Sequence, residues 1–149
     1  MPRVVLDSSV LISAFVAPHG EVMPLLREPL KSRYHAALSM NILEETTQKL
    51  LTKPALRRYA SYRDDDVHAY IAWLLSQAEL VEGELPGLRV VPDDPKDDMV
   101  VATAVAAEAD YLVSGDRHLL SLGRYEGIAI ISVRQFLDML GDEHEARAA

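Results

Sequence analysis

The sequence contains no cysteine among its 149 residues, so it can form neither a disulfide nor a thiolate zinc site. It also lacks any apolar run near the roughly 20 residues that a membrane-spanning helix needs. The N-terminal segment MPRVVLDSSV enters a strand-like apolar run at once, so we expect no signal peptide. Together these absences predict a cytoplasmic protein.

Positively charged residues are fewer than negatively charged ones. The chain has 15 Lys and Arg against 23 Asp and Glu, for a net charge of −8 and a pI near 5.0. This balance argues against a protein whose main task is to coat nucleic acid, because phosphate contacts need clustered Lys and Arg. The basic residues are uneven, however, since 8 of the 15 lie between residues 27 and 63. They form either a local basic face or an ordinary solvated helix surface.

The pattern of apolar residues predicts one α/β domain. The length favours a single core over residues 1–140, followed by a flexible tail at 141–149. Continuous apolar runs predict five buried strands, at residues 3–7, 34–39, 88–92, 111–114 and 128–133. Helical segments alternate with these strands. We therefore expect a three-layer α/β/α sandwich with a central, mostly parallel sheet.

Several helix starts can be read from residues that cap helices. Ser8 or Ser9 can cap a helix that follows the first strand, and Asn41 can cap the segment ILEETTQKLLTK. Residues 64–81, DDDVHAYIAWLLSQAELV, form the clearest amphipathic pattern. Ser61 can cap that helix, whose acidic first turn suits the helix dipole better than a metal site.

Four carboxylates fall where a parallel sheet binds its ligands, outside the carboxyl ends of the strands. Asp7 ends the first strand, and Glu45 lies on the helix after the second. Asp97 lies in the first turn of the helix after the third strand, and Asp116 follows the fourth. No histidine base, lysine or glycine-rich phosphate loop accompanies them. Such an oxygen cluster is typical of Mg²⁺ or Mn²⁺ sites, which support hydrolysis of phosphodiesters.

The acidic stretch VVPDDPKDDM also fits a purely structural helix start. Asp94 would be the N-cap, with Pro95 at the first helical position and Asp97 near the positive end of the helix dipole. For Asp94 we favour capping over metal binding. Asp93 and Asp98 are predicted to be exposed flankers. For Asp97 the two roles are compatible, because its side chain can point past the strand ends.

The other acids have structural readings of their own. Glu44 and Glu45 are adjacent on one helix, and their spacing alone does not show which faces the site. Asp116, in the segment SGD, could be an ordinary turn residue. Asp7 is harder to explain in this way, because a buried acid at a strand end needs a partner or a cation. The five histidines show no paired spacing, so zinc is not indicated.

Three segments of the sequence resemble the four motif blocks of PIN-domain ribonucleases. VVLDSSVLISA is similar to the opening motif of the family, and LSMNILEETTQKLL to its second block, a register that selects Glu45. The segment DPKDDMVVATAVAAEADYLVSGDRHLL resembles the third and fourth blocks and selects Asp97 and Asp116. The likeness runs from residue 3 to about residue 137 and is closest to the VapC-like toxins of bacterial toxin–antitoxin pairs.

This resemblance implies an RNA phosphodiesterase that uses Mg²⁺ or Mn²⁺. It also implies a homodimer restrained by a small antitoxin protein. The implied metal ligands and catalytic residues are Asp7, Glu45, Asp97 and Asp116, of which Glu45 completes the shell or positions water. Ser9 and Ser114 are expected to orient these carboxylates, and the expected RNA-binding residues are Lys49, Lys53, Arg57 and Arg58.

Two positions depart from the family pattern. Ser9 stands where many members have Asn, and His118 stands where many have a further Asp, which puts a fifth acidic ligand in doubt. The main rival hypothesis is a non-catalytic PIN-like module that binds a protein or RNA partner. A phosphohydrolase with an aspartyl nucleophile would need Asp-x-Asp after the first strand, where this chain has DSS. A phospho-receiver domain would need a late lysine, but the last lysine is Lys96.

Overall fold

The computed structural model describes residues 1–27, 33–83, 85–91 and 94–148, with side chains through Gly141. The strands are β1 (Arg3–Leu6), β2 (His35–Ser39), β3 (Glu79–Val81), β4 (Tyr111–Val113), β5 (Arg124–Tyr125) and β6 (Ile128–Ile131). They form one sheet in the order β3-β2-β1-β4-β6-β5, in which every pairing is parallel except that of β5 with β6. The parallel α/β class predicted from the apolar runs is confirmed.

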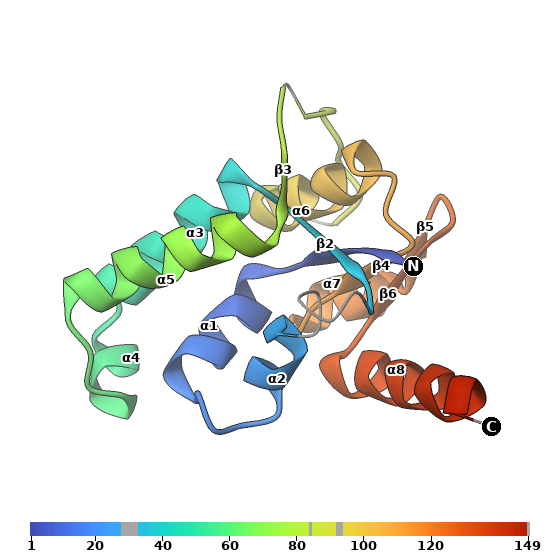
Figure 1. Ribbon diagram of the computed structural model, residues 1–149. Coiled ribbons are helices and arrows are strands. Elements are labelled where there is room, and N and C mark those ends of the chain that lie inside the picture. The colour runs from blue at the N-terminus through green and yellow to red at the C-terminus, as the bar shows by residue number, and fades with distance from the viewer. Residues whose placement is uncertain (28–32, 84, 92–93, 149) are drawn as a thin grey trace.

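Eight helices occur in the described segments and complete the layers. They are α1 (Ser8–Val16), α2 (Val22–Arg27), α3 (Met40–Thr52), α4 (Pro54–Tyr59), α5 (Asp64–Gln77), α6 (Pro95–Ala106), α7 (Arg117–Leu122) and α8 (Val133–Ala148). Figure 1 places α6 and α8 on opposite sides of the central strands. Both sides are therefore covered, which is why Val4, Val5 and Leu6 of β1 are all buried. None of the described helices is long and apolar enough to cross a membrane.

The parallel register brings several strand ends to one edge of the sheet. Leu6 at the end of β1 pairs with Val113 at the end of β4, and Ser39 at the end of β2 pairs with Val81. Each strand is followed by a helix or loop that begins at this edge. Side chains just beyond β1 and β4 therefore lie close together although about 107 residues separate them in sequence.

The third predicted strand is wrong. Residues 88–91 are irregular, and the edge strand beside β2 is instead β3 at Glu79–Val81, inside the predicted long helix. The backbone N–H groups of Val90 and Val91 instead donate to the Asp98 carboxylate, each at 2.8 Å. A side chain therefore replaces the strand ladder there. The two-residue strand β5 was not predicted.

Three helix caps also differ from the prediction. Asp7, and not Ser8 or Ser9, is the N-cap of α1, since its Oδ1 accepts the Ser8 N–H at 2.8 Å. Ser39 caps α3 in place of the predicted Asn41, with Oγ accepting the Ile42 N–H. The start of α5 is capped at Arg63, and not by Ser61. The backbone N–H of Arg63 donates to Asp66 Oδ2 at 2.8 Å.

The C-terminal helix is longer than predicted. Residues 141–148, expected to be a flexible tail, continue α8 to Ala148. The segment contains Ala, Glu and Arg, which favour helix, and Gly141 has no positive φ that would end the helix there. Asp93, predicted to be an exposed flanker, lies outside the described residues.

Candidate metal centre

Asp7 lies at the junction of β1 and α1 and is fixed by three hydrogen bonds. Its Oδ1 accepts the Ser8 N–H, while its Oδ2 accepts the Ser9 hydroxyl at 2.9 Å and the Ser114 hydroxyl at 2.7 Å. Only 4% of the residue is exposed. Burial raises the pKa of Asp7 above its usual 3.8 despite these hydrogen bonds, and the negative charge of Glu45 raises it further. Asp7 is thus a rigid, buried acid.

Asp97 occupies the first turn of α6 and has an unsatisfied carboxylate. The residue is 7% exposed, and its Oδ2 has no hydrogen-bond partner within the described part of the chain. Burial raises its pKa to about 8, with further contributions from a hydrogen bond to Asp94 and from the charges of Asp116, Asp94 and Asp7. These acids are therefore close enough to repel one another. A buried oxygen of this kind is where a cation would be expected.

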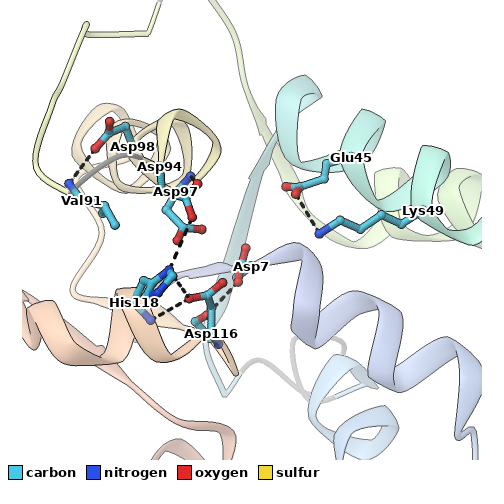
Figure 2. Close-up of polar contacts among 10 residues, drawn as sticks. Asp7, Glu45, Lys49, Val91, Asp94, Asp97, Asp98, Asp116 and His118 are labelled. Atoms are coloured by element: carbon cyan, nitrogen blue, oxygen red, sulfur yellow. Dashed lines mark hydrogen bonds and ion pairs between the residues drawn. The ribbon is translucent and has the colours of Figure 1, made fainter. Parts of the chain in front are cut away.

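Asp116 and His118 lie together at the start of α7, directly after β4. Asp116 Oδ1 accepts the His118 N–H at 2.7 Å, so Asp116 caps this short helix. The imidazole Nδ1 of His118 lies 3.6 Å from Asp94 Oδ2 and 3.9 Å from Asp116 Oδ1. Figure 2 shows the ring between these two acids, with Asp7 and Asp97 beside them.

Two serines connect the β1 and β4 ends. The Ser114 hydroxyl donates to Asp7 and accepts the Asp116 N–H at 2.9 Å. The Ser9 hydroxyl donates to Asp7 and accepts the Gly115 N–H at 3.0 Å. Both serines thereby orient Asp7 and hold the loop that carries Asp116. Ser9 and Ser114 are the two residues that were expected from the sequence to orient the carboxylates.

Glu45 faces the acids from the opposite helix, α3, and is set apart from them (Figure 2). Its side chain is 16% exposed and forms an ion pair with Lys49 one turn later, at 2.9 Å. The negative charge of Glu45 contributes to the raised pKa of Asp7. Glu44, by contrast, is exposed. The structure therefore distinguishes two adjacent acids that sequence spacing alone did not.

Asp94 combines a cap with a position in the acidic group. As predicted, its Oδ1 accepts the Asp97 N–H at 3.1 Å and starts α6. Its other oxygen faces His118, which the sequence did not indicate. Partial burial favours the neutral acid, but hydrogen bonds from Asp97 and His118 hold the pKa of Asp94 below its usual 3.8.

Asp98 is not the exposed flanker that the sequence predicted. It is half-buried and accepts the N–H groups of Val90 and Val91, so it holds the segment before α6 (Figure 2). Successive residues on a helix point about 100° apart, which sends Asp97 into the acidic group and Asp98 away from it. Only one of the two adjacent acids is thus available to the site.

The described residues contain one compact group with donor atoms suited to a metal ion. One ligand atom each from Asp94, Asp97 and His118 lies within 4.8 Å of the others. Asp7 and Asp116 adjoin this group, as their electrostatic effect on Asp97 shows. In the sequence, Asp94 lies three residues before Asp97, a spacing that places both at one helix start. No sequence spacing connects either residue with His118.

The four basic residues predicted to bind RNA differ in their surroundings. Lys49 is paired with Glu45, and Arg57 contacts Asp64 at 2.5 Å and the Tyr62 ring at 4.8 Å. Arg57 therefore holds α4 against neighbouring segments. Lys53 and Arg58 are exposed, and no ion pair to either is found among the described residues.

Comparison with known proteins identifies the family. A family model described as the PIN domain matches residues 3–118. The chain belongs to the PIN-domain family. The family resemblance of its acidic motifs is thereby confirmed. No curated protein matches it.

Two solved structures have a similar fold. One is VapBC2 from Rickettsia felis, bound to a DNA fragment from its promoter, with 17% identity and a TM-score of 0.59. That match covers 87% of this PIN-domain chain and 98% of the other. The second is PAE2754 from Pyrobaculum aerophilum, with 20% identity, a TM-score of 0.59, and coverage of 95% and 96%. At these identities the likeness establishes the fold.

Proposed function

We propose that this PIN-domain protein is a Mg²⁺- or Mn²⁺-dependent endoribonuclease and the toxin of a toxin–antitoxin pair. The observation that carries the metal dependence is the unpartnered Oδ2 of Asp97, buried beside other carboxylates. A fold gains no stability from acids that repel one another in this way. A divalent cation would remove the repulsion, and hard oxygen donors are the ligands that Mg²⁺ and Mn²⁺ prefer.

The acidic residues of the site would have different roles in the proposed reaction. Asp7, Asp97 and Asp116 would hold the cation directly or through water, with Asp7 kept in place by its three hydrogen bonds. Glu45, on the facing helix, would complete the shell or position the attacking water. A bound divalent cation supplies Lewis acidity, which activates water and neutralises charge that develops on a phosphodiester.

The RNA backbone would approach along α3. Glu45, on α3, faces the acids, and Lys53, the C-cap of the same helix, lies roughly 12 Å further along its axis, given a rise of about 1.5 Å per residue. The helix α4, which carries Arg58, follows directly after the end of α3 (Figure 1). These two exposed cations can bind phosphates next to an acidic centre that would otherwise repel them.

The toxin assignment rests on family likeness. One similar structure is a VapBC2 assembly with promoter DNA, which supports the proposal of a small antitoxin protein as a partner of this chain. We further propose that the protein forms a homodimer and acts in the cytoplasm. Expression of the wild-type protein should then slow bacterial growth, and Asp97→Asn should abolish that effect.

The decisive experiment measures cleavage of labelled single-stranded RNA with Mg²⁺ or Mn²⁺. Asp7→Asn and Asp97→Asn should each lower the rate by on the order of 10²-fold or more, since each removes charge from the cation site. Asp98→Asn is the matched control, because Asp98 faces away from the site. Equal cleavage by wild type and both site variants would contradict the assignment. Absence of cleavage by the wild type, with retained partner binding, would favour the non-catalytic module.

A further inference from the structure

The position of His118 points to the metal preference of this site. We infer that Asp94, Asp97 and His118 form a cation position that binds Mn²⁺ in preference to Mg²⁺. The inference rests on the proposed function only in that the acidic group holds a divalent cation. It adds Asp94 as a ligand, and it makes His118 a nitrogen ligand at the position where many family members have a further Asp.

The geometry of the three side chains suits a single ion. Their ligand atoms all lie within 4.8 Å of one another, and His118 Nδ1 is 3.6 Å from Asp94 Oδ2. Ligands at about 2.1 Å from an octahedral ion are separated by at most roughly 4.2 Å. A small side-chain adjustment therefore closes the group around a cation. His118 is free to make it, because its side chain is 69% exposed.

The unsatisfied oxygen of Asp97 provides the second, independent observation. Asp97 is 7% exposed, and its Oδ2 lacks a partner in the part of the chain that is described. The first oxygen of Asp94 is occupied by the Asp97 N–H, which leaves its second oxygen turned toward His118. Two carboxylate oxygens and one imidazole nitrogen are thus directed into the same space (Figure 2).

A simple ion pair is a weaker account of His118. Its distances to Asp94 and Asp116 are 3.6 and 3.9 Å, and an exposed pair of this kind stabilises a fold very little. Such a pair also leaves the buried Asp97 oxygen without a partner. A cation between the three side chains satisfies that oxygen and the imidazole together.

The nitrogen ligand is what discriminates between metals. Mg²⁺ selects oxygen donors and releases its waters reluctantly, whereas transition-metal ions accept imidazole readily. Mn²⁺ accepts carboxylate and water as well as imidazole, which suits a site in which two ligands are acids. An aspartate at position 118 would instead make the site all-oxygen and remove the advantage of Mn²⁺.

The test measures metal binding and not activity. Mn²⁺ is added to the full-length protein, and pulsed electron paramagnetic resonance detects coupling of the ion to a directly bound ¹⁴N nucleus. Titration calorimetry gives the Mg²⁺ and Mn²⁺ dissociation constants. We compare wild type with His118→Asp, His118→Gln and the control His35→Asn. His35 is also exposed but lies at the start of β2, at the other edge of the sheet.

We expect ¹⁴N coupling in the wild type and in His35→Asn, and its loss in both His118 variants. The ratio of the Mg²⁺ to the Mn²⁺ dissociation constant should fall by roughly tenfold or more in His118→Asp, because the variant replaces the nitrogen ligand that favours Mn²⁺ with an oxygen donor. Both variants should fold, because position 118 is exposed and aspartate is favourable in the first turn of a helix.

Bound Mn²⁺ without ¹⁴N coupling, or an unchanged ratio in His118→Asp, would overturn the inference. The outcome is separable from that of the proposed nuclease function. Coupling in a protein that does not cleave RNA would support the metal position and refute the nuclease. Metal-dependent cleavage without coupling would refute the metal position alone.

Discussion

Asp94 accepts the backbone N–H of Asp97 at 3.1 Å, so one acid of the group caps the helix that positions the next. The cap holds the two carboxyl groups close together at the N-terminus of α6. Burial and the repulsion between nearby negative charges oppose ionisation of Asp97 and raise its pKa to about 8. Hydrogen bonds keep the pKa of Asp94 below its usual value. The same local hydrogen bond thus starts the helix and prepares a cation site.

The stability of the metal-free protein should decrease as the pH rises toward 8. The folded-state pKa of Asp97, about 8, is above the usual 3.8, so folding favours its protonated form. This contribution is complete below about pH 4 and is lost as the pH approaches 8, at up to about 1.4 kcal/mol per pH unit for one proton. Asp7, whose pKa is also raised, contributes in the same direction.

Urea unfolding in EDTA between pH 5.8 and 8 measures this dependence. Asp97→Asn should flatten the curve and make the metal-free protein more stable than the wild type at pH 8. Excess Mn²⁺ should raise wild-type stability at pH 8 but not that of the variant. If the wild-type protein became more stable with rising pH in EDTA, ionisation of Asp97 would not control the pH dependence of its stability.

Replacement of Asp98 should loosen the segment before α6 without affecting metal binding. Asp98→Ala removes the acceptor of the Val90 and Val91 N–H groups and should cost about 1–3 kcal/mol in the free energy of unfolding. Asp98→Asn keeps an acceptor oxygen and should cost less than half as much. Hydrogen exchange at Val90 and Val91 should accelerate in the alanine variant only, and unchanged exchange would contradict this role.

Ser114 should support both the fold and the site. Its buried hydroxyl joins Asp7 to the Asp116 N–H, so Ser114→Ala should lower the free energy of unfolding by about 1–3 kcal/mol. Loss of this orientation should also weaken Mn²⁺ binding by roughly 10- to 100-fold. Ser76→Ala, on the exposed surface of α5, is the matched control. Calorimetry that finds equal Mn²⁺ affinity in both variants would exclude an orienting role.

The basic residues at the end of α3 and on α4 should separate into those that bind RNA and one that stabilises the fold. Lys53→Ala and Arg58→Ala should weaken RNA binding and reduce its salt dependence by a slope of about 0.7 each. Arg57→Ala should instead lower the free energy of unfolding by about 1–2 kcal/mol, because Arg57 contacts Asp64 and the Tyr62 ring. Fluorescence anisotropy at several salt concentrations, paired with urea unfolding, tests both. A salt slope that only Arg57→Ala reduces would reverse the assignment.

Much of the fold could be predicted because its signals are local. The runs that became β1, β2, β4 and β6 are mostly apolar, as is typical of strands covered on both faces. The strand β3 could not be found in this way. It is a short edge strand whose residues are only partly buried, and its identity depends on pairing with Ala37–Ser39, more than 40 residues away.

By itself the sequence determined the α/β class, the PIN-family motifs and the placement of acids beyond the strand ends. Only the tertiary structure decided how each acid is used. Asp97 and Asp98 are chemically identical neighbours, yet one is buried without a partner and the other binds the backbone of Val90 and Val91. His118 reaches Asp94 across 24 residues of chain. Helix direction is encoded locally, but these contacts depend on where other segments come to lie.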